Sequence, residues 1–545
     1  MRTIKLAIPL LIALTVSVFL AGCPASREVH DATDESAADT ENIFQLNRPD
    51  WSDITSDEVW NNLPTIYDSE GAEAALLYID KAMASGIITP DEGNQVRAGF
   101  LYQLGRLDDA FLSLLPYQID TDHPELLELR AEITWGMCRY IEAKSNYEML
   151  LESEGDNPRA STLLALTRLY DDLRDFNKSD EMRKRLASVY HESPELLSLN
   201  ISDAILSENP DRISSAIAEW KIATGSNESD DPVLVLAGSY ETALKGDKQN
   251  ARNMLRLFDT EYGLDLSVAE RLFALDIELG DFNGFREDIL RNLERLGGSG
   301  WLTASEEEWP ESVENNIQTA AILSHAAALE LGYNNIETAE LLAVRIINFL
   351  NPYDISAALQ LSAIKVFTED LQSAFEILNE TYRLAAPSDI RIRLRLLQYS
   401  RMENSETPVP WNSDAVAVEL DEILDNRLER FPENAFFNAA AADLKAYRGD
   451  VAGALRMYEN VCLFPGATRE MHLRRAYYLA RLQRPDDAWS VVSEHLPTLS
   501  PYMAWANTLA SKALATNDSS LALLAVRVFE HLGHAVSAGD TSASE

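Results

Sequence analysis

The segment GRLDDAF, residues 105–111, decides the fold because related segments recur along the chain. Each begins with residues that favour a turn and ends on a small residue inside a helical pattern. The recurrences are CRYIEAK (138–144), RDFNKSD (174–180), GDKQNAR (246–252), GDFNGFR (280–286), EDLQSAF (369–375), RGDVAGAL (448–455) and RPDDAW (484–489). Within contiguous runs the small residues lie 33 to 37 positions apart, at Ala110, Ala143, Ser179, Ala216, Ala251, Gly284, Ala339, Ala374, Ala454, Ala488 and Ala522. A regular period of this length predicts a tandem repeat.

A second small residue lies twelve positions before each of these. Ten of the eleven positions are small, and Leu272 is the exception. The positions are Ala98, Ala131, Thr167, Ala204, Ser239, Leu272, Ala327, Ser362, Ala442, Ala476 and Ala510. Small residues on both helices of a hairpin allow the two helices to cross closely. Because no alternating strand pattern of useful length appears, the sequence predicts an all-α protein.

Prolines mark the joints between repeats. The intervals are 33 to 36 residues, with prolines at Pro124, Pro158 and Pro194, at Pro352 and Pro387, and at Pro432 and Pro465. Proline is favoured at the first position of a helix, where its missing N–H has no partner to lose. Thr89 and Glu92 flank Pro90 in the pattern of a capping box, which predicts another helix start.

This pattern resembles the tetratricopeptide repeat (TPR), a helix pair of 34 residues with conserved small positions. The resemblance covers residues 90–532 and implies an α-solenoid of about twelve repeats. The family's large aromatic residue early in the first helix is mostly replaced here, for example by Leu127, Leu163 or Asn438. Inserted loops at 297–311 and 405–411 interrupt the period.

The interruptions suggest a division of the solenoid into two superhelical segments. We expect one TPR-like segment at 49–296, an irregular loop at 297–312 and a second TPR-like segment at 313–536. Residues 537–545 are expected to be a disordered tail, because they are short, polar and follow the last repeat.

The N-terminus has the pattern of an export signal. Arg2 and Lys5 precede seventeen uncharged residues, from Leu6 to Gly22, which is short of a bilayer span. Leu20-Ala21-Gly22-Cys23 resembles the lipobox of bacterial lipoproteins. The resemblance implies that residues 1–22 are a cleaved signal peptide and that Cys23 carries the lipid, including palmitate. An ordinary signal peptide with a chance cysteine is the alternative.

The segment that follows Cys23 is polar and acidic. Residues 23–48 lack hydrophobic periodicity, so they predict a disordered acidic tether. Pro24 stands where some bacteria place an Asp for inner-membrane retention. The resemblance therefore favours an outer-membrane anchor with the protein facing the periplasm.

The charge of the chain restricts its partners. Lys and Arg number 46 against 88 Asp and Glu, a net charge of −42. Such a chain repels nucleic acid, so we expect no nucleic-acid partner. Basic or amphipathic protein segments remain possible partners.

The sequence contains no motif typical of an enzyme. Cys138 and Cys462 are far apart, and no cysteine or histidine cluster with zinc-binding spacing occurs. The glycine-rich GGSG at 297–300 lacks the Lys-Ser/Thr of a P-loop. We therefore expect no catalytic residues, no metal and no cofactor.

The resemblance implies that partners bind in the concave groove, on the first helix of each pair. The groove-facing positions include Tyr102, Glu125, Glu128, Glu132, Trp135, Arg168, Asp171, Tyr240, Phe273 and Tyr477. Acids with interspersed aromatics fit a segment that carries Lys or Arg. The alternative is that the acids are only solvated and the aromatics pack between repeats. Trp309, in the loop SEEEWPE (305–311), is a second candidate docking residue.

Two functions fit these features. The first is a lipid-anchored interaction scaffold of the cell envelope, serving assembly or secretion machinery through its TPR grooves. The second is an accessory lipoprotein of a solute-uptake system that pairs with a periplasmic binding protein. A basic, salt-sensitive partner would favour the first, and an enclosed apolar pocket would favour the second.

Overall fold

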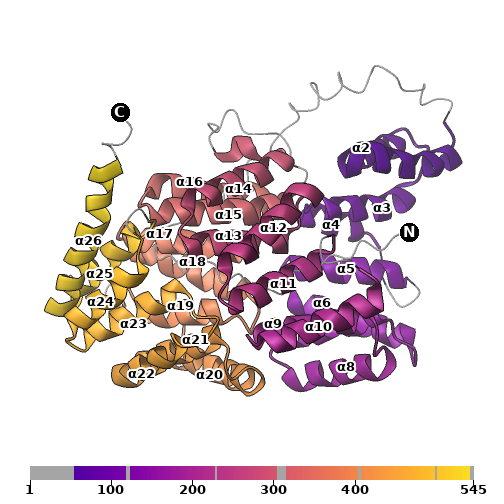
Figure 1. Ribbon diagram of the computed structural model, residues 1–545. Helices are drawn as coiled ribbons and strands as arrows, with labels where there is room; N and C mark the ends of the chain where they lie inside the picture. Colours follow the sequence, from indigo (N-terminus) through magenta and orange to yellow (C-terminus); the bar gives the residue numbers. More distant parts are fainter. Residues whose placement is uncertain are drawn as a thin grey trace. The chain divides into compact units, whose positions relative to one another are not determined.

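The computed structural model describes residues 54–539, except 118, 120–122, 227–229, 303–312, 314, 403–406 and 498–499. No β-strand occurs in these ranges, and the predicted all-α class is confirmed. Helices α3 to α26 form twelve consecutive pairs, and α2 precedes them (Figure 1). Cys23, the signal peptide, the acidic tether and Trp309 lie outside the described residues.

The chain forms two compact units, and each is described by itself. Among the described residues, the N-terminal unit comprises 54–153 together with 313 and 315–317, and the C-terminal unit comprises 154–302 and 318–539. Residues 303–312 of the predicted loop at 297–312 lie outside the described residues, so its role as a boundary stays a prediction.

The N-terminal unit contains the first two pairs and the helix before them. Its helices are α2 (Ser56–Ala84), α3 (Pro90–Gln103), α4 (Leu107–Leu114), α5 (Pro124–Gly136) and α6 (Tyr140–Glu154). Helix α2 is broken at Gly71, whose φ of 90° lies in the region that favours glycine. The capping box predicted from Thr89 and Glu92 starts α3.

The C-terminal unit contains the remaining ten pairs. The pairs up to the interruption are α7 (Ala160–Asp172), α8 (Phe176–Val189), α9 (Pro194–Leu206), α10 (Pro210–Thr224), α11 (Pro232–Leu244), α12 (Lys248–Tyr262), α13 (Leu266–Leu279) and α14 (Phe282–Arg295), followed by a 3-10 turn, η2 (Ser299–Leu302). The later helices are α15 (Asn316–Gly332), α16 (Ile336–Arg345) with a π-turn η4 (Ile346–Leu350), α17 (Ile355–Phe367), α18 (Leu371–Leu384), α19 (Ile390–Ser400), α20 (Ser413–Arg430), α21 (Ala435–Tyr447), α22 (Val451–Val461), α23 (Arg469–Arg481), α24 (Pro485–His495), α25 (Met503–Thr516) and α26 (Ser519–Gly539). The first two residues of α15 belong to the N-terminal unit.

The recurring turn segments connect the two helices of each pair. In GDFNGFR, Gly280 ends α13 with a φ of 76°, and the Asp281 carboxylate accepts a hydrogen bond of 2.9 Å from the N–H of Gly284. The left-handed residue stops the first helix, and the aspartate caps the second. Asp175, Asp247, Asp370 and Asp450 cap their helices in the same way. The turn chemistry therefore explains why these segments mark the repeat.

The small residues lie where the paired helices touch. Apart from the last pair, the small residues of both sets are buried. In the pair α7–α8, Ser179 donates a hydrogen bond of 2.9 Å to the carbonyl oxygen of Thr167, which lies twelve positions earlier. The last pair differs, because Ala522 is exposed and Ala510 is half-buried. The period extends into this pair, but its small residues do not form the contact.

Within the C-terminal unit the late repeats pack against the early ones. The side-chain amide of Asn434, which caps α21, donates to the Leu206 carbonyl at the end of α9 at 2.9 Å. Arg469, at the start of α23, donates to the carbonyls of Ile277 and Glu278 at the end of α13, at 2.7 and 2.8 Å. Side chains at the starts of late helices thus donate hydrogen bonds to carbonyls at the ends of early helices, which have no partner within their own helix.

The pair α13–α14 contains a buried network of ions with α12. Asp259, Asp276 and Asp288 are each about 1% exposed or less. Arg252, Arg256, Arg291 and Arg295 form ion pairs with them. The charges therefore compensate one another, as buried charges must. None of the helices in the described ranges combines the length and the apolar character needed to cross a bilayer.

Candidate functional site

Three predicted groove residues come together in the N-terminal unit. Glu125, Glu128 and Glu132 are three and four positions apart on α5, so they share one face of the helix. Glu125 is exposed, whereas Glu128 and Glu132 are half-buried. Burial raises the pKa of the Glu132 carboxyl to about 7, and the charge of Glu128 contributes.

Tyr102 on α3 lies close enough to Glu132 for the two side chains to interact. Burial raises the pKa of its phenol above the ordinary value, and the negative charge of Glu132 adds to this effect. Tyr102, Glu128 and Glu132 therefore form one acidic cluster, which we call the α3–α5 groove. Trp135, one turn further along α5, packs against Tyr147 of α6, with ring centroids 6.3 Å apart in an edge-on arrangement. Its ring thus contacts its own helix pair.

Arg168 and Asp171 lie on α7, in the C-terminal unit. The Asp171 carboxylate is 2.7 Å from a guanidinium nitrogen of Arg427 and 3.7 Å from one of Arg430, both on α20. Burial is the main cause that lowers the pKa of Arg168, to about 10. Asp171 therefore faces another part of the same unit, and Arg168 is buried near Asp172 of its own helix and Arg183 of α8.

The aromatic candidates of the C-terminal unit make internal contacts. The guanidinium of Arg271 lies 3.9 Å from the ring centroid of Tyr240, and Phe273 is fully buried between Phe285 and His325. Tyr477 on α23 receives a hydrogen bond of 3.1 Å from Arg481.

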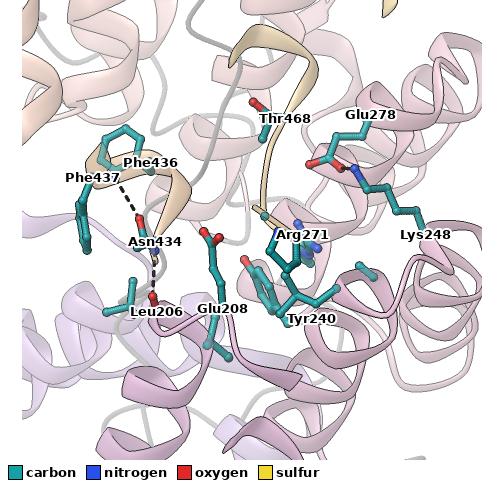
Figure 2. A pocket seen from close by; sticks show the side chains of 15 residues that line it. Leu206, Glu208, Tyr240, Lys248, Arg271, Glu278, Asn434, Phe436, Phe437 and Thr468 are labelled. Carbon is teal, nitrogen blue, oxygen red and sulfur yellow. Dashed lines mark hydrogen bonds and ion pairs between the residues drawn. The ribbon is translucent and has the colours of Figure 1, made fainter. Parts of the chain in front are cut away.

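A small cavity lies between early and late repeats of the C-terminal unit (Figure 2). Its volume is about 60 Å³, which is room for water molecules and far below the 300 Å³ or more of typical ligand pockets. The lining residues come from α9 to α13 on one side and from α21 to α23 with their connections on the other, and they include Leu206, Glu208, Tyr240, Lys248, Arg271, Glu278, Asn434, Phe436, Phe437, Gly466 and Thr468.

Glu208 is the central polar group of this cavity. It follows α9 in the left-handed conformation, with a φ of 50°. One carboxylate oxygen accepts a hydrogen bond of 3.1 Å from the N–H of Ala435 at the start of α21, while the other is buried without a partner. Burial raises the pKa of this carboxyl to about 7, although the N–H groups of Ala435 and Gly466 lower it in part. Nε of Arg271 is also buried without a hydrogen bond. A water molecule in the cavity would therefore bridge the Glu208 carboxylate and the Arg271 guanidinium.

The sequence analysis did not predict Glu208 and Arg271 as site residues. Glu208 and its partner Ala435 are 227 positions apart, so no local pattern relates them.

The arrangement of these groups does not provide an obvious reaction centre. Among the described residues, no group of three or more His, Cys, Asp and Glu side chains is placed to hold a metal ion. The three buried aspartates of the ion network have arginine partners and do not line the cavity. His531 contacts the Leu496 carbonyl at 2.9 Å and packs against Trp489, beside an open groove of about 740 Å³ between α24 and α26.

No protein-family model matches the chain, and no curated protein sequence gives a significant match. Among solved structures, one that is similar is the APC/C hetero-tetramer Cut9-Hcn1, at 13% identity and a TM-score of 0.36, covering 89% of this chain and 94% of that one. A second is an IFIT1 monomeric mutant with Gppp-AAAA, at 12% identity and a TM-score of 0.33, covering 75% and 96%. A third is Naa15/Naa10 bound to HypK-THB, at 14% identity and a TM-score of 0.24, covering 87% and 75%.

Similarity at these scores has no bearing on function. We assign the fold class from the chain itself, on the basis of its helix pairs, their period and the residues of the connecting turns. The protein is an all-α solenoid of TPR-like helix pairs.

Proposed function

We propose that this protein is a lipid-anchored interaction scaffold of the bacterial cell envelope. Its α3–α5 groove holds a partner segment that carries Lys or Arg. The observation that carries the proposal is the convergence of Tyr102, Glu128 and Glu132 on two neighbouring first helices.

The electrostatics of the groove favour a cationic ligand. Glu132 is held beside Glu128 in a partly desolvated position, so its ionised form is disfavoured. A Lys or Arg of a partner would pair with these carboxylates and offset that cost. Tyr102 supplies an aromatic surface at low entropic cost, which suits the stem of a long basic side chain.

The anchor is proposed from the sequence around Cys23. A lipid on this residue would hold the solenoid at the membrane surface, and two or more acyl chains would make the attachment stable. The proposed location is the periplasmic face of the outer membrane. Partner proteins would then be other components of envelope assembly or secretion machinery.

The solute-uptake alternative receives less support. It calls for a pocket that encloses a small molecule, and the cavity beside Glu208 has a volume of only about 60 Å³. That volume is too small for a metabolite.

Two measurements test the proposal. Radiolabelled palmitate should enter the wild-type protein and not the Cys23→Ala variant, and labelling that survives the substitution would refute the anchor. Crosslinking and co-purification from membranes should lose partners in a Glu128→Lys/Glu132→Lys variant. Glu152→Lys is a control for one such charge reversal, because it replaces an exposed glutamate of α6 in the same unit. Partners that persist in the double variant would contradict a role for the groove.

A further inference from the structure

We propose that the groove between α24 and α26 is a second binding site, which takes an amphipathic helix with a basic side chain from a partner protein. This site belongs to the C-terminal unit and is independent of the α3–α5 groove. We call it the α24–α26 groove and define it by its lining residues, which are Asp486, Trp489, Ser490, Arg527, Glu530 and His531.

The groove is formed by the second helices of two consecutive pairs. Helices α24 and α26 pack side by side (Figure 1). On each helix the lining residues lie at positions i, i+3 and i+4, so each helix contributes one face to the groove. The volume of about 740 Å³ lies within the range of ligand pockets. The groove therefore has room for the side chains of a partner, unlike the cavity beside Glu208.

Two contacts across the groove hold its walls together. A guanidinium nitrogen of Arg527 lies 2.9 Å from the carboxylate of Asp486. The rings of Trp489 and His531 meet edge-on, with their centroids 5.7 Å apart, and Nε2 of His531 lies 2.9 Å from the carbonyl oxygen of Leu496. Because these contacts order the aromatic wall before a partner arrives, little conformational freedom is lost on binding.

Glu530 is the carboxylate that this pairing leaves available. It is exposed, and within the part of the chain that the structure describes it makes no ion pair. Arg527, three positions earlier on α26, pairs with Asp486 across the groove instead. The side chain that suits both Glu530 and the indole of Trp489 is therefore a lysine or an arginine. Its charged head would pair with the carboxylate, and its stem would pack on the ring.

An apolar stripe on α26 continues from Glu530. Val526 lies four positions before Glu530 and Leu523 lies seven positions before it, so the three residues share one face of the helix. Leu523 and Val526 are 40% and 52% exposed. A partner helix that packs along this stripe would bury both apolar side chains, and removing them from water would contribute to affinity.

The spacing of these groups selects the form of the partner. Leu523 and Glu530 are seven residues apart on a helix, which corresponds to about 10 Å along its axis. A second helix that lies along α26 can match them with apolar residues at positions i and i+3 and a Lys or Arg at i+7. The exposed stripe therefore fits one face of an amphipathic helix.

Charge decides between a basic partner and a second copy of this chain. Each copy carries a net charge of −42, so two copies repel one another as they approach. The same charge attracts a basic helix and complements it at Glu530. The occupant that the α24–α26 groove fits is therefore a basic amphipathic helix of another protein.

The experiment measures peptide binding to the full chain in detergent by fluorescence anisotropy. The probe is a labelled helical peptide with Leu at positions i and i+3 and Arg at i+7. A peptide of the same composition in scrambled order and a peptide with Glu in place of Arg are the controls. We expect binding of the patterned basic peptide alone, and we expect its affinity to fall as salt is raised.

The parent chain for these measurements is Glu128→Lys/Glu132→Lys, which removes two carboxylates of the α3–α5 groove. Binding by this parent chain does not depend on those carboxylates, so failure of one site is distinguishable from failure of the other. If the wild-type chain binds the patterned peptide and the parent chain does not, the peptide occupies the α3–α5 groove and the present proposal is wrong.

Variants of α26 place the binding at the α24–α26 groove. Val526→Asp should lower affinity by about tenfold or more, and Glu530→Lys by about fivefold. Ile222→Asp and Glu287→Lys are matched controls, because they introduce the same charges at exposed positions of α10 and α14 in the same unit, and they should leave affinity unchanged. Circular dichroism and denaturation midpoints check folding, and Leu523→Asp carries the test if Val526→Asp proves unstable.

Three further results would overturn the proposal. They are equal binding of the scrambled peptide, full affinity in a folded Val526→Asp variant, and a dimer in analytical ultracentrifugation that Val526→Asp dissociates. The last result would show that a second copy of the chain occupies this face of α26, whereas we expect a monomer.

Discussion

Replacing Gly332 by alanine tests the packing of the last repeat onto α15 in the C-terminal unit. Gly332 is the last residue of α15, and a Cβ at this position would lie 2.4 Å from the carbonyl oxygen of Pro501 and 2.7 Å from its Cβ. Both atoms belong to a rigid residue just before α25, so neither can rotate away. The two segments would have to separate by about 1 Å or more to restore normal contact distances.

The expected cost follows from this clash. Overpacking of a tight contact destabilises by about 1 to 3 kcal/mol. Alanine recovers at most about 1 kcal/mol over glycine through helix propensity, and less at a helix end. We therefore expect a net loss of about 1 to 2 kcal/mol. Gly533→Ala in α26 is the matched control, because no atom lies within 4 Å of its added Cβ, and it should be neutral or stabilising.

Urea denaturation followed by circular dichroism measures both variants. Hydrogen exchange should also accelerate near Asn334 and Asn507, whose side chains are joined by a hydrogen bond of 2.9 Å beside the clash. If Gly332→Ala proves as stable as the wild-type protein, with unchanged exchange at these residues, the reasoning about this contact is wrong.

Three further predictions concern charge and pH. Arg256→Met removes a partner of the buried Asp288 and should cost about 3 kcal/mol of unfolding free energy, whereas Arg484→Met breaks an exposed pair and should cost less than about 1 kcal/mol in the same denaturation assay. Burial lowers the pKa of His325 to about 4, so the folded state binds fewer protons than the unfolded state. Unfolding free energy should therefore fall by about 2 kcal/mol between pH 7 and 4.5, and this loss should be absent in His325→Phe. Because the pKa of Glu132 is about 7, binding of a Lys-rich peptide to the α3–α5 groove should strengthen from pH 6 to pH 8, and a pH-independent affinity would contradict its role.

The period and the turn segments predicted the fold well, for a local reason. A turn that ends one helix on a left-handed residue and caps the next with an aspartate depends on only three or four neighbouring residues, as at Gly280 and Asp281. The buried small residues obey the same periodicity, except in the last pair. There Ala522 is exposed and Ala510 is half-buried.

The candidate sites were predictable only in part. Glu128 and Glu132 share a helix face, so the period places them together without knowledge of the superhelix. Asp171 and Glu208 contact residues more than two hundred positions away, and those contacts depend on how the late repeats return to the early ones.

The surroundings of Glu132 differ from those of the aspartates in the buried ion network. In the network each aspartate has an arginine partner, and the charges support the fold. Glu132 instead lies beside the like charge of Glu128. Its folded pKa is above its unfolded value, so its ionisation costs stability as the pH rises from about 4.3 towards 7.

At neutral pH Glu132 is therefore retained against the stability of the fold, which is typical of residues kept for binding. Glu132→Gln should leave unfolding free energy unchanged or raised while it abolishes binding at the α3–α5 groove. If this substitution clearly destabilises the protein, the side chain supports the fold, and the argument for the groove fails.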